Sequence, residues 1–341
     1  YKETYLFNAT LRADGSSRFA KGNRFGYFPS FSAGWVITNE KFMQGIAKYM
    51  DYFKLRASWG QVGNNSIANF LYASPVTLID GDYNFGTGKG SATNSTGAYP
   101  NRIGNEDLKW ETSEQTDIGF DARFIDGRLN VNFDAYWKST KDWIVQAPII
   151  GTAGADAPYI NGGDVKNTGV ELGMTWSDKI GKVQYNIGGN FAYNKNEVGK
   201  INTADGMIHG STNVMFNNQS EFYRISEGHA MGYFWGFKTD GLFQNQQEID
   251  EWVAAGNGIL SGAQPGDIKV IDLNHDGKLD DADKVDLGNG IPKFNFGFNL
   301  RLTWKELDFS MVWSGAAGFK VVNGGYRNWG SSSQSNYTTY F

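Results

Sequence analysis

Long runs in which apolar and polar residues strictly alternate are the feature that most constrains this chain. Within 294–304 the even positions are all apolar: Phe294, Phe296, Phe298, Leu300, Leu302 and Trp304. The odd positions of that run are Asn, Gly, Asn, Arg and Thr, and 128–138 repeats the pattern. Because successive side chains of a strand point to opposite faces, each run predicts a strand with one apolar and one largely polar face. Such strands are predicted at 3–13, 28–37, 52–60, 109–124, 128–138, 167–176, 183–194, 294–304 and 307–314.

Short and long connections take turns between these strands. The short ones are Asp126-Gly127, Ser177 to Lys182, Lys305-Glu306 and, as the widest, 38–51. The long ones are 14–27, 61–108, 139–166 and 195–293. Connections of this length are uncommon in compact soluble domains, whereas transmembrane barrels have short periplasmic turns and long extracellular loops. We therefore expect an all-β fold, an antiparallel transmembrane β-barrel segment with its short turns on the periplasmic side.

Composition excludes several other classes of protein. The 341 residues include no cysteine, so there is no disulfide framework, thiolate zinc site or cysteine nucleophile. The formal charge of −5 argues against a nucleic-acid partner, which usually needs a basic face. No run of apolar residues is long enough for a transmembrane helix, but a strand can cross a bilayer with only every second residue apolar. Aromatic residues make up 15% of the chain, with 44 Gly and 7 Pro, which suits long antiparallel strands.

Tryptophans mark both ends of the apolar faces. Trp176 and Trp304 precede tight turns, whereas Trp59 and Trp137 precede long connections. Aromatic residues at both edges of an apolar band are typical of the interfacial girdles of a membrane barrel. The alternative is a soluble β-sandwich, in which the apolar faces form a core and the tryptophans fill it.

Residues 272–283, inside the longest connection, follow the pattern of a twelve-residue calcium loop. The predicted Ca²⁺ ligands are Asp272, Asn274, Asp276, the backbone carbonyl of Lys278, Asp280 and Asp283. Gly277 stands at the sixth position, where the loop turns sharply and a Cβ would clash. The ion would have a structural role, because it would neutralise clustered carboxylates and fix a long connection.

The motif departs from the usual pattern at its last position, where Asp283 replaces glutamate and reaches less easily for bidentate binding. No pair of flanking helices is evident, so we expect a single loop rather than a paired sensor. His275 would face away from the ion. The alternative is a surface turn rich in Asp, Asn and Gly that binds no ion.

Residues for catalysis are not evident, and we expect no enzymatic activity. The three histidines all lie in the longest connection without metal-ligand spacing, and no G-x-S-x-G motif occurs. The glycine-rich run 86–91 lacks the spacing of a phosphate-binding loop. Glu111, Asp117 and Asp121 share one face of a strand, which could suggest a glycosidase pair, but polar lining of a barrel lumen explains them more simply.

Several blocks of sequence resemble the SusC/RagA family of TonB-dependent outer-membrane transporters. They are spread over nearly the whole chain in the order of the family: 8–19, 25–35, 55–64, 108–117, 167–173, Gly266-Asp267 and 290–292. The resemblance implies a 22-stranded barrel filled by an N-terminal plug, of which about ten strands are expected here. On this interpretation 1–341 is part of the barrel domain, 195–293 is a long extracellular loop, and the plug and the final strands lie outside the chain.

The resemblance also implies a function. It predicts TonB-energised import of oligosaccharides or oligopeptides across the outer membrane of a Gram-negative bacterium. A SusD-like surface lipoprotein would cap the long loops, and TonB would act through the absent N-terminal part. The alternative is a secreted, soluble, calcium-stabilised carbohydrate-binding or adhesive β-module. A glycosidase acting on the same glycans is a third reading, for which the sequence offers no site.

Overall fold

The computed structural model describes residues 1–46, 48–85, 93–147, 149–203, 205–214 and 220–322. The glycine-rich run 86–91 and the last residues of the chain, to which two of the expectations above refer, lie outside these ranges. The chain divides into two compact units, Tyr1–Gly206 with Pro292–Ala317, and Met207–Ile291 with the residues from Gly318 onward. No helix among the described residues is both long and apolar enough to cross a membrane.

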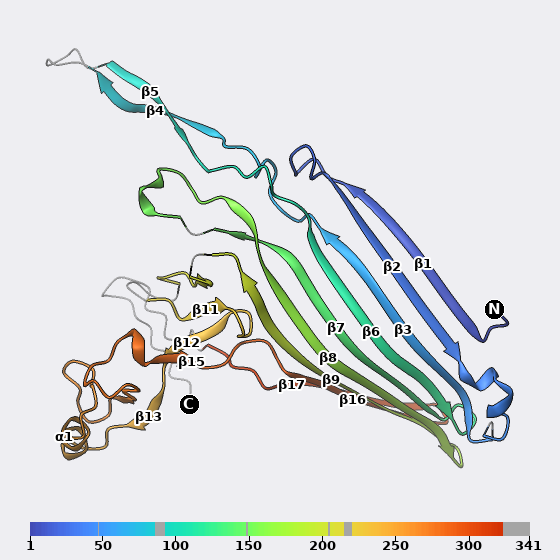
Figure 1. The fold of residues 1–341 in the computed structure, drawn as a ribbon. Helices are drawn as coiled ribbons and strands as arrows, with labels where there is room; N and C mark the ends of the chain where they lie inside the picture. Colours follow the sequence, from blue (N-terminus) through green and yellow to red (C-terminus); the bar gives the residue numbers. More distant parts are fainter. Residues whose placement is uncertain (47, 86–92, 148, 204, 215–219, 323–341) are drawn as a thin grey trace. The chain divides into compact units, whose positions relative to one another are not determined.

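The first unit is an antiparallel sheet of nine strands, and each of the nine predicted strands is present (Figure 1). Their bounds are β1 Tyr5–Gly15, β2 Phe25–Val36, β3 Met50–Asn64, β6 Glu111–Phe124, β7 Leu129–Gln146, β8 Tyr159–Ile180, β9 Val183–Ile201, β16 Phe294–Trp304 and β17 Leu307–Ala317. Strands pair in chain order, with β1 and β17 at the edges of the described sheet. The all-β prediction is therefore confirmed.

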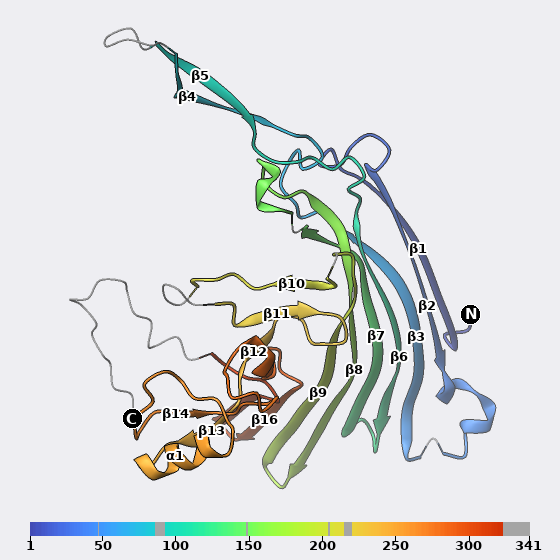
Figure 2. The ribbon, with the colours of Figure 1, turned by 60° about the vertical axis from the view of Figure 1, so that its left-hand side comes forward.

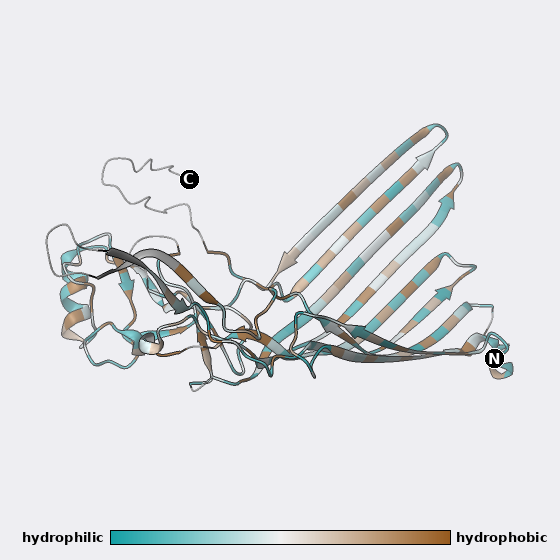
Figure 3. Cartoon of the chain, turned by 90° about the horizontal axis from the view of Figure 1, so that it is seen from above, coloured by the Kyte–Doolittle hydropathy of each residue, from teal (hydrophilic) through white to brown (hydrophobic). Residues whose placement is uncertain are grey.

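Most apolar residues of the nine strands lie on one face of this sheet. One register row crosses it from edge to edge through Tyr5, Trp35, Leu55, Phe120, Phe133, Leu172, Phe191, Phe296 and Gly315. Apolar and polar bands alternate along each strand (Figure 3). Many large side chains of this face are exposed, with Phe7 at 75% and Ile118 at 53%, so no described part of the chain covers these.

The opposite face is polar, and its glycines make room for long side chains of the neighbouring strand. A Cβ built on the glycine would come within 2.4 Å of that side chain in four pairs: Gly119 with Asp134, Gly173 with Asn132, Gly188 with Asn299, and Gly297 with Asn190. In all four pairs the two residues are register partners on adjacent strands. These contacts explain why the strands are rich in glycine, which otherwise weakens a strand.

The tight turns all lie at one end of the sheet, together with the connection between β2 and β3 (Figure 2). That connection contains two short 3₁₀ helices, η1 Ile37–Asn39 and η2 Lys41–Met43. The predicted turn from Ser177 to Lys182 is wrong in its bounds, since β8 continues to Ile180 and only Gly181 and Lys182 turn. Gly181 has a φ of +61°, which permits this two-residue hairpin.

At the other end, β7, β8 and β9 run further than predicted. Asp142 has a φ of +57°, and the β7–β8 register shifts between Thr140 and Trp143. This bulge breaks the alternation of apolar and polar residues, so the sequence pattern ends although the pairing continues. The connection predicted at 139–166 shortens to 147–158, where η3 Gly151–Ala153 lies.

A small hydrophobic core joins the connections at this end. Phe19, Phe28, Leu71, Leu108 and Trp110 pack together, and Phe19 and Leu108 are fully buried. The ring centroid of Trp110 lies 5.4 Å from that of Phe19 and 5.6 Å from that of Phe28. The connection between β3 and β6 also contains a hairpin that the sequence did not predict, β4 Val76–Phe85 and β5 Thr93–Pro100.

The second unit has secondary structure of its own. One sheet contains β10 Met207–His209, β11 Tyr223–Ser226, β12 Tyr233–Phe237 and β15 Lys284–Asp286. A separate pair is β13 Thr239–Leu242 and β14 Ile268–Val270. The helix α1 Gln246–Ala254 begins after Asn245, whose side chain accepts a hydrogen bond from the Glu248 amide. The 3₁₀ helix η4 Asp281–Asp283 ends the calcium-type motif.

Candidate metal site

The calcium-type motif forms a loop of successive Asx turns. In each turn a side-chain oxygen accepts a hydrogen bond from the backbone amide two residues later. The pairs are Asn274 with Asp276 at 3.0 Å, Asp276 with Lys278 at 2.9 Å, and Asp280 with Ala282 at 2.8 Å. These bonds engage one oxygen of each side chain and fix its direction.

Asp272 lies at the base of the loop and is fully buried. Its Oδ2 accepts hydrogen bonds from the amides of Gly258 at 2.8 Å and Gly277 at 2.9 Å. Its Oδ1 is buried and has no hydrogen-bond partner. Burial opposes ionisation, but the backbone amides, first those of Gly258 and Gly277, outweigh it and lower the pKa of Asp272. Asp272 is therefore a buried carboxylate with one oxygen that accepts no hydrogen bond.

Asp283 closes the loop and is also fully buried. Its Oδ1 accepts from the Leu273 amide and its Oδ2 from the Asp280 amide, each at 2.9 Å. Neither Asp272 nor Asp283 forms an ion pair with a lysine or arginine among the described residues. Two buried carboxylates in one loop thus have backbone dipoles as partners but no cationic side chain.

The turn of the loop has the expected backbone. Gly277 has a φ of +78°, which agrees with the requirement for glycine at the sixth position. His275 has a φ of +58° and its side chain is exposed.

The predicted ligands are only partly brought together. Among the described residues, no three His, Cys, Asp or Glu side chains are arranged to hold a metal ion. Two predicted ligands near the surface of the loop bond to each other instead: Asn274 Nδ2 donates a hydrogen bond to Asp276 Oδ2 at 3.1 Å. The turns and the unpartnered oxygen of Asp272 agree with an ion-binding loop, whereas calcium itself stays a prediction.

Gly258 is a residue of this site that the sequence did not predict. Besides its bond to Asp272, its carbonyl accepts from Trp252 Nε1 of α1 at 3.3 Å. A Cβ at this position would lie 2.6 Å from the carbonyl carbon of Lys278, a predicted ligand. The contact spans the helix and the loop, so no local pattern could have revealed it. Gly258 therefore connects α1 with the calcium-type loop.

A second polar cluster in the same unit surrounds Glu221. Its carboxylate accepts hydrogen bonds from Arg224 Nε at 2.6 Å and lies 3.0 Å from His209 Nδ1. The guanidinium of Arg224 lies 4.2 Å from the centroid of the Trp235 ring. Burial alone would raise the pKa of Glu221, but the hydrogen bonds from Arg224 and His209 outweigh it and lower the pKa.

The three carboxylates that could suggest a glycosidase pair have neighbours on the polar face of the sheet. Asp121 lies 3.0 Å from Arg56, which also binds Asp134 at 2.9 Å. Asp117 accepts from Gln115 at 2.8 Å and from Ser58 at 3.2 Å. Glu111 accepts from Asn64 at 3.3 Å. Contacts within the sheet, most of them between β3 and β6, thus account for all three side chains.

Comparison with protein families gives a match over the whole chain. The family model for the TonB dependent receptor-like β-barrel matches residues 1–341. TonB-dependent receptor P3 of Formosa agariphila is 30% identical over 338 residues, which cover 95% of this chain and 31% of that protein. TonB-dependent receptor SusC of Bacteroides thetaiotaomicron is 29% identical over 314 residues, which cover 90% of this chain and 29% of that protein.

Solved structures agree in fold. The RagAB peptide importer in its closed-closed state matches with a TM-score of 0.73 and 21% identity, covering 95% of this chain and 33% of that one. The structure of the RagAB peptide transporter gives a TM-score of 0.71 and 20% identity, covering 92% of this chain and 31% of that one. The chain thus spans about a third of the length of these relatives, such as 31% of receptor P3.

Proposed function

The chain belongs to the TonB dependent receptor-like β-barrel family, and on that basis we propose that the full-length protein, here called the parent, imports oligomeric nutrients with energy supplied through TonB. Its place is the outer membrane of a Gram-negative bacterium. The observation that carries the proposal is the register row of apolar side chains from Tyr5 to Phe296, which are exposed or half-buried on one face of nine paired strands. A barrel wall needs this arrangement, with its apolar face to lipid and its polar face to the lumen.

The substrate we propose is an oligosaccharide or an oligopeptide. RagAB is named a peptide importer, and SusC is a relative over 90% of the chain. The polar face offers amide and carboxylate groups that hydrogen-bond to either class, as Asn299 and Asp134 illustrate. We propose a SusD-like surface lipoprotein as the partner that covers the long connections, and TonB as the partner of a plug outside this chain.

Extraction of the full-length parent tests this function. Native outer membranes would be dissolved in detergent, and the proteins that co-purify with the parent identified by mass spectrometry. Recovery in the detergent fraction together with a surface lipoprotein supports the importer. Recovery in the aqueous fraction without a lipoprotein would contradict it and favour the secreted calcium-stabilised binding module.

We also propose that the loop 272–283 binds Ca²⁺ as a structural ion. The side chains of Asp272, Asn274, Asp276, Asp280 and Asp283 and the carbonyl of Lys278 would hold it, as in a twelve-residue calcium loop. Support comes from the unpartnered buried oxygen of Asp272 and from the two buried carboxylates without a cationic side chain. Buried charge is costly unless it is compensated, and a divalent cation supplies that compensation.

The test compares two aspartates of the same motif. Asp272→Asn removes a proposed ligand, whereas Asp281→Asn alters an exposed carboxylate that pairs with Lys284. Limited proteolysis of the detergent-solubilised parent would be measured with Ca²⁺ and with chelator. We expect Ca²⁺ to protect the segment 257–290 in the parent and in Asp281→Asn, but not in Asp272→Asn. Equal cleavage of the parent with and without Ca²⁺ would contradict the proposed calcium site.

A further inference from the structure

The connection between β2 and β3 exposes large apolar side chains. Phe42 is 66% exposed, Ile46 48% and Tyr49 65%, all within eight residues. Lys41 and Lys48 lie beside them and are exposed as well. In water such a short turn needs none of these apolar residues, and exposed apolar patches of this kind mark an interaction surface.

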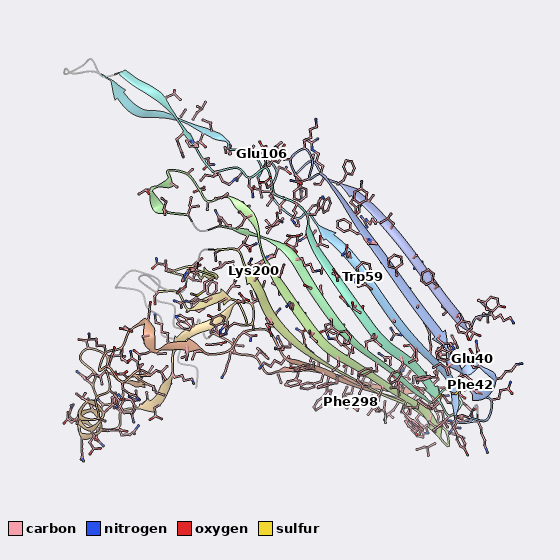
Figure 4. The ribbon with its side chains drawn as sticks, viewed as in Figure 1. Glu40, Phe42, Trp59, Glu106, Lys200 and Phe298 are labelled. Carbon is pink, nitrogen blue, oxygen red and sulfur yellow. The ribbon has the colours of Figure 1, made fainter. Side chains whose placement is uncertain are left out.

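This cluster is continuous with the apolar face of the sheet. The ring of Phe42 makes an edge contact with Trp35, with the centroids 6.5 Å apart. Trp35 in turn stacks on Tyr5, at 6.5 Å and an interplanar angle of 11°. Both Tyr5 and Trp35 belong to the apolar register row of the sheet. Phe42 therefore extends the apolar face beyond the end of the strands, next to Glu40 (Figure 4).

Glu40 links this extension to the aromatic side chains of the apolar face. Its Oε1 accepts hydrogen bonds from Tyr5 Oη at 2.5 Å and from Trp35 Nε1 at 3.1 Å. These two bonds, first that of Tyr5, lower the pKa of Glu40, so the carboxylate stays ionised. An ionised carboxylate is costly in hydrocarbon, so in a bilayer the lowest-energy position of Glu40 and its aromatic partners would be the headgroup level. Aromatic side chains prefer that level in membrane proteins.

From this geometry we propose that residues 37–46, with Lys48 and Tyr49, form a phospholipid-binding anchor on the periplasmic leaflet of the outer membrane. Phe42, Ile46 and Tyr49 enter the boundary between headgroups and acyl chains, and Lys41 and Lys48 face the lipid phosphates. The inference rests on the proposed placement of the sheet as a barrel wall. The inference goes beyond that placement, because a turn on the periplasmic side needs only to reverse the chain and need not bind lipid.

Neighbouring turns support lipid as the occupant rather than a protein partner. Ile180 is 72% exposed and Leu307 65%, each beside a tight turn at the same end of the sheet. Trp304, the register partner of Leu307, is 45% exposed. Exposed apolar residues thus follow this end across distant strands, as a continuous lipid boundary requires and a localised protein site does not. The two lysines add attraction to anionic phospholipid.

Spin labelling tests the anchor in the full-length parent. The 341 residues contain no cysteine, so single cysteines report from chosen positions once any cysteine elsewhere in the parent is replaced. Phe42→Cys and Ile46→Cys probe the anchor, and the second serves if the first lowers the yield. Ile118→Cys on the apolar face is the control for lipid, and Phe70→Cys, 63% exposed in the connection after β3, is the control for water. Each variant would be reconstituted in phospholipid vesicles that contain phosphatidylglycerol.

The readout is the accessibility of the label to oxygen, which concentrates in lipid, relative to a water-soluble nickel chelate. We expect the ratio at positions 42 and 46 to be several-fold above that at position 70 and close to that at position 118. Ratios at 42 and 46 equal to that at 70, with 118 in lipid, would overturn the anchor and leave the barrel wall intact. A water-like ratio at 118 would overturn the wall itself and the anchor with it.

Discussion

Replacing Phe19 by alanine should loosen the connections at the long-loop end without unfolding the sheet. Phe19 is fully buried in the core with Leu71, Leu108 and Trp110, and each of these residues belongs to a connection rather than to a strand. Removal of a buried phenylalanine costs about 3–5 kcal/mol when the cavity remains. Surface connections relax more than a domain core, so we take the lower value of about 3 kcal/mol, which corresponds to a factor of roughly 150 in a local opening equilibrium.

Amide hydrogen exchange of the solubilised parent measures this factor. The Ser16 amide bonds to the Arg24 carbonyl at 2.9 Å, and the Leu108 amide bonds to the Asn105 carbonyl at 3.4 Å. Both amides should exchange faster by up to roughly 150-fold in Phe19→Ala, because local opening controls their exchange. Amides of β6 should keep their rates. The matched control is Phe70→Ala, an exposed ring, and acceleration no greater than in this control would refute the core as the element that holds these connections.

Three further outcomes are expected from single substitutions. Gly63→Ala should weaken the same core by about 1–3 kcal/mol, because its Cβ would lie 1.9 Å from Phe28 Cζ, and amide exchange at Ser16 would show it. Gly258→Ala should weaken calcium protection without removing a ligand, since its Cβ would meet the backbone of Lys278, and the proteolysis assay measures the shift in Ca²⁺ concentration. The pKa of Glu221 is lower in the folded than in the unfolded protein, where it is about 4.3. The ionised carboxylate therefore stabilises the folded state above a pH of about 4.3, and this stabilisation is lost as the pH falls through the pKa of the folded state. In Glu221→Gln, amide exchange in β11 should lose that acid dependence, and an unchanged acid profile would contradict it.

Sequence alone predicted the wall well, for a physical reason. A sheet with one face in lipid needs an apolar residue at every second position, so the alternation extends along the whole membrane-spanning part of each strand. The strand predicted at 294–304 has the bounds of β16, and 183–194 covers the first twelve residues of β9. Beyond the apolar band this constraint ends. The bulge at Asp142 and the last residues of β9 therefore carry no periodic signal, although their backbones stay paired.

The connections were harder to predict because their contacts are short and non-local. Strands such as β10 and β14 contain three residues, too few for a period of two to be seen. The helix α1 has nine residues and one buried position, Ile249, so its apolar face is weakly marked. Within the calcium-type loop the backbone turns follow local spacing and agree with the motif. The bond from Gly258 to Asp272 joins residues fourteen positions apart, which no local motif encodes.

The polar face also bears on how such a wall would treat its substrate. Asn132 of β7, Asn190 of β9 and Asn299 of β16 lie across glycines of the neighbouring strands. Asparagine amides also bond across strands, Asn196 to Asn167 and Asn299 to Asn186. Amide groups donate and accept without charge, so they serve peptide amides and sugar hydroxyls about equally. In the proposed importer, a lumen wall of this chemistry would bind peptides and glycans about equally weakly. In the proposed importer, selectivity is therefore left to the long connections and their partner, and exchange of those connections between relatives should move substrate preference where exchange of the strands does not.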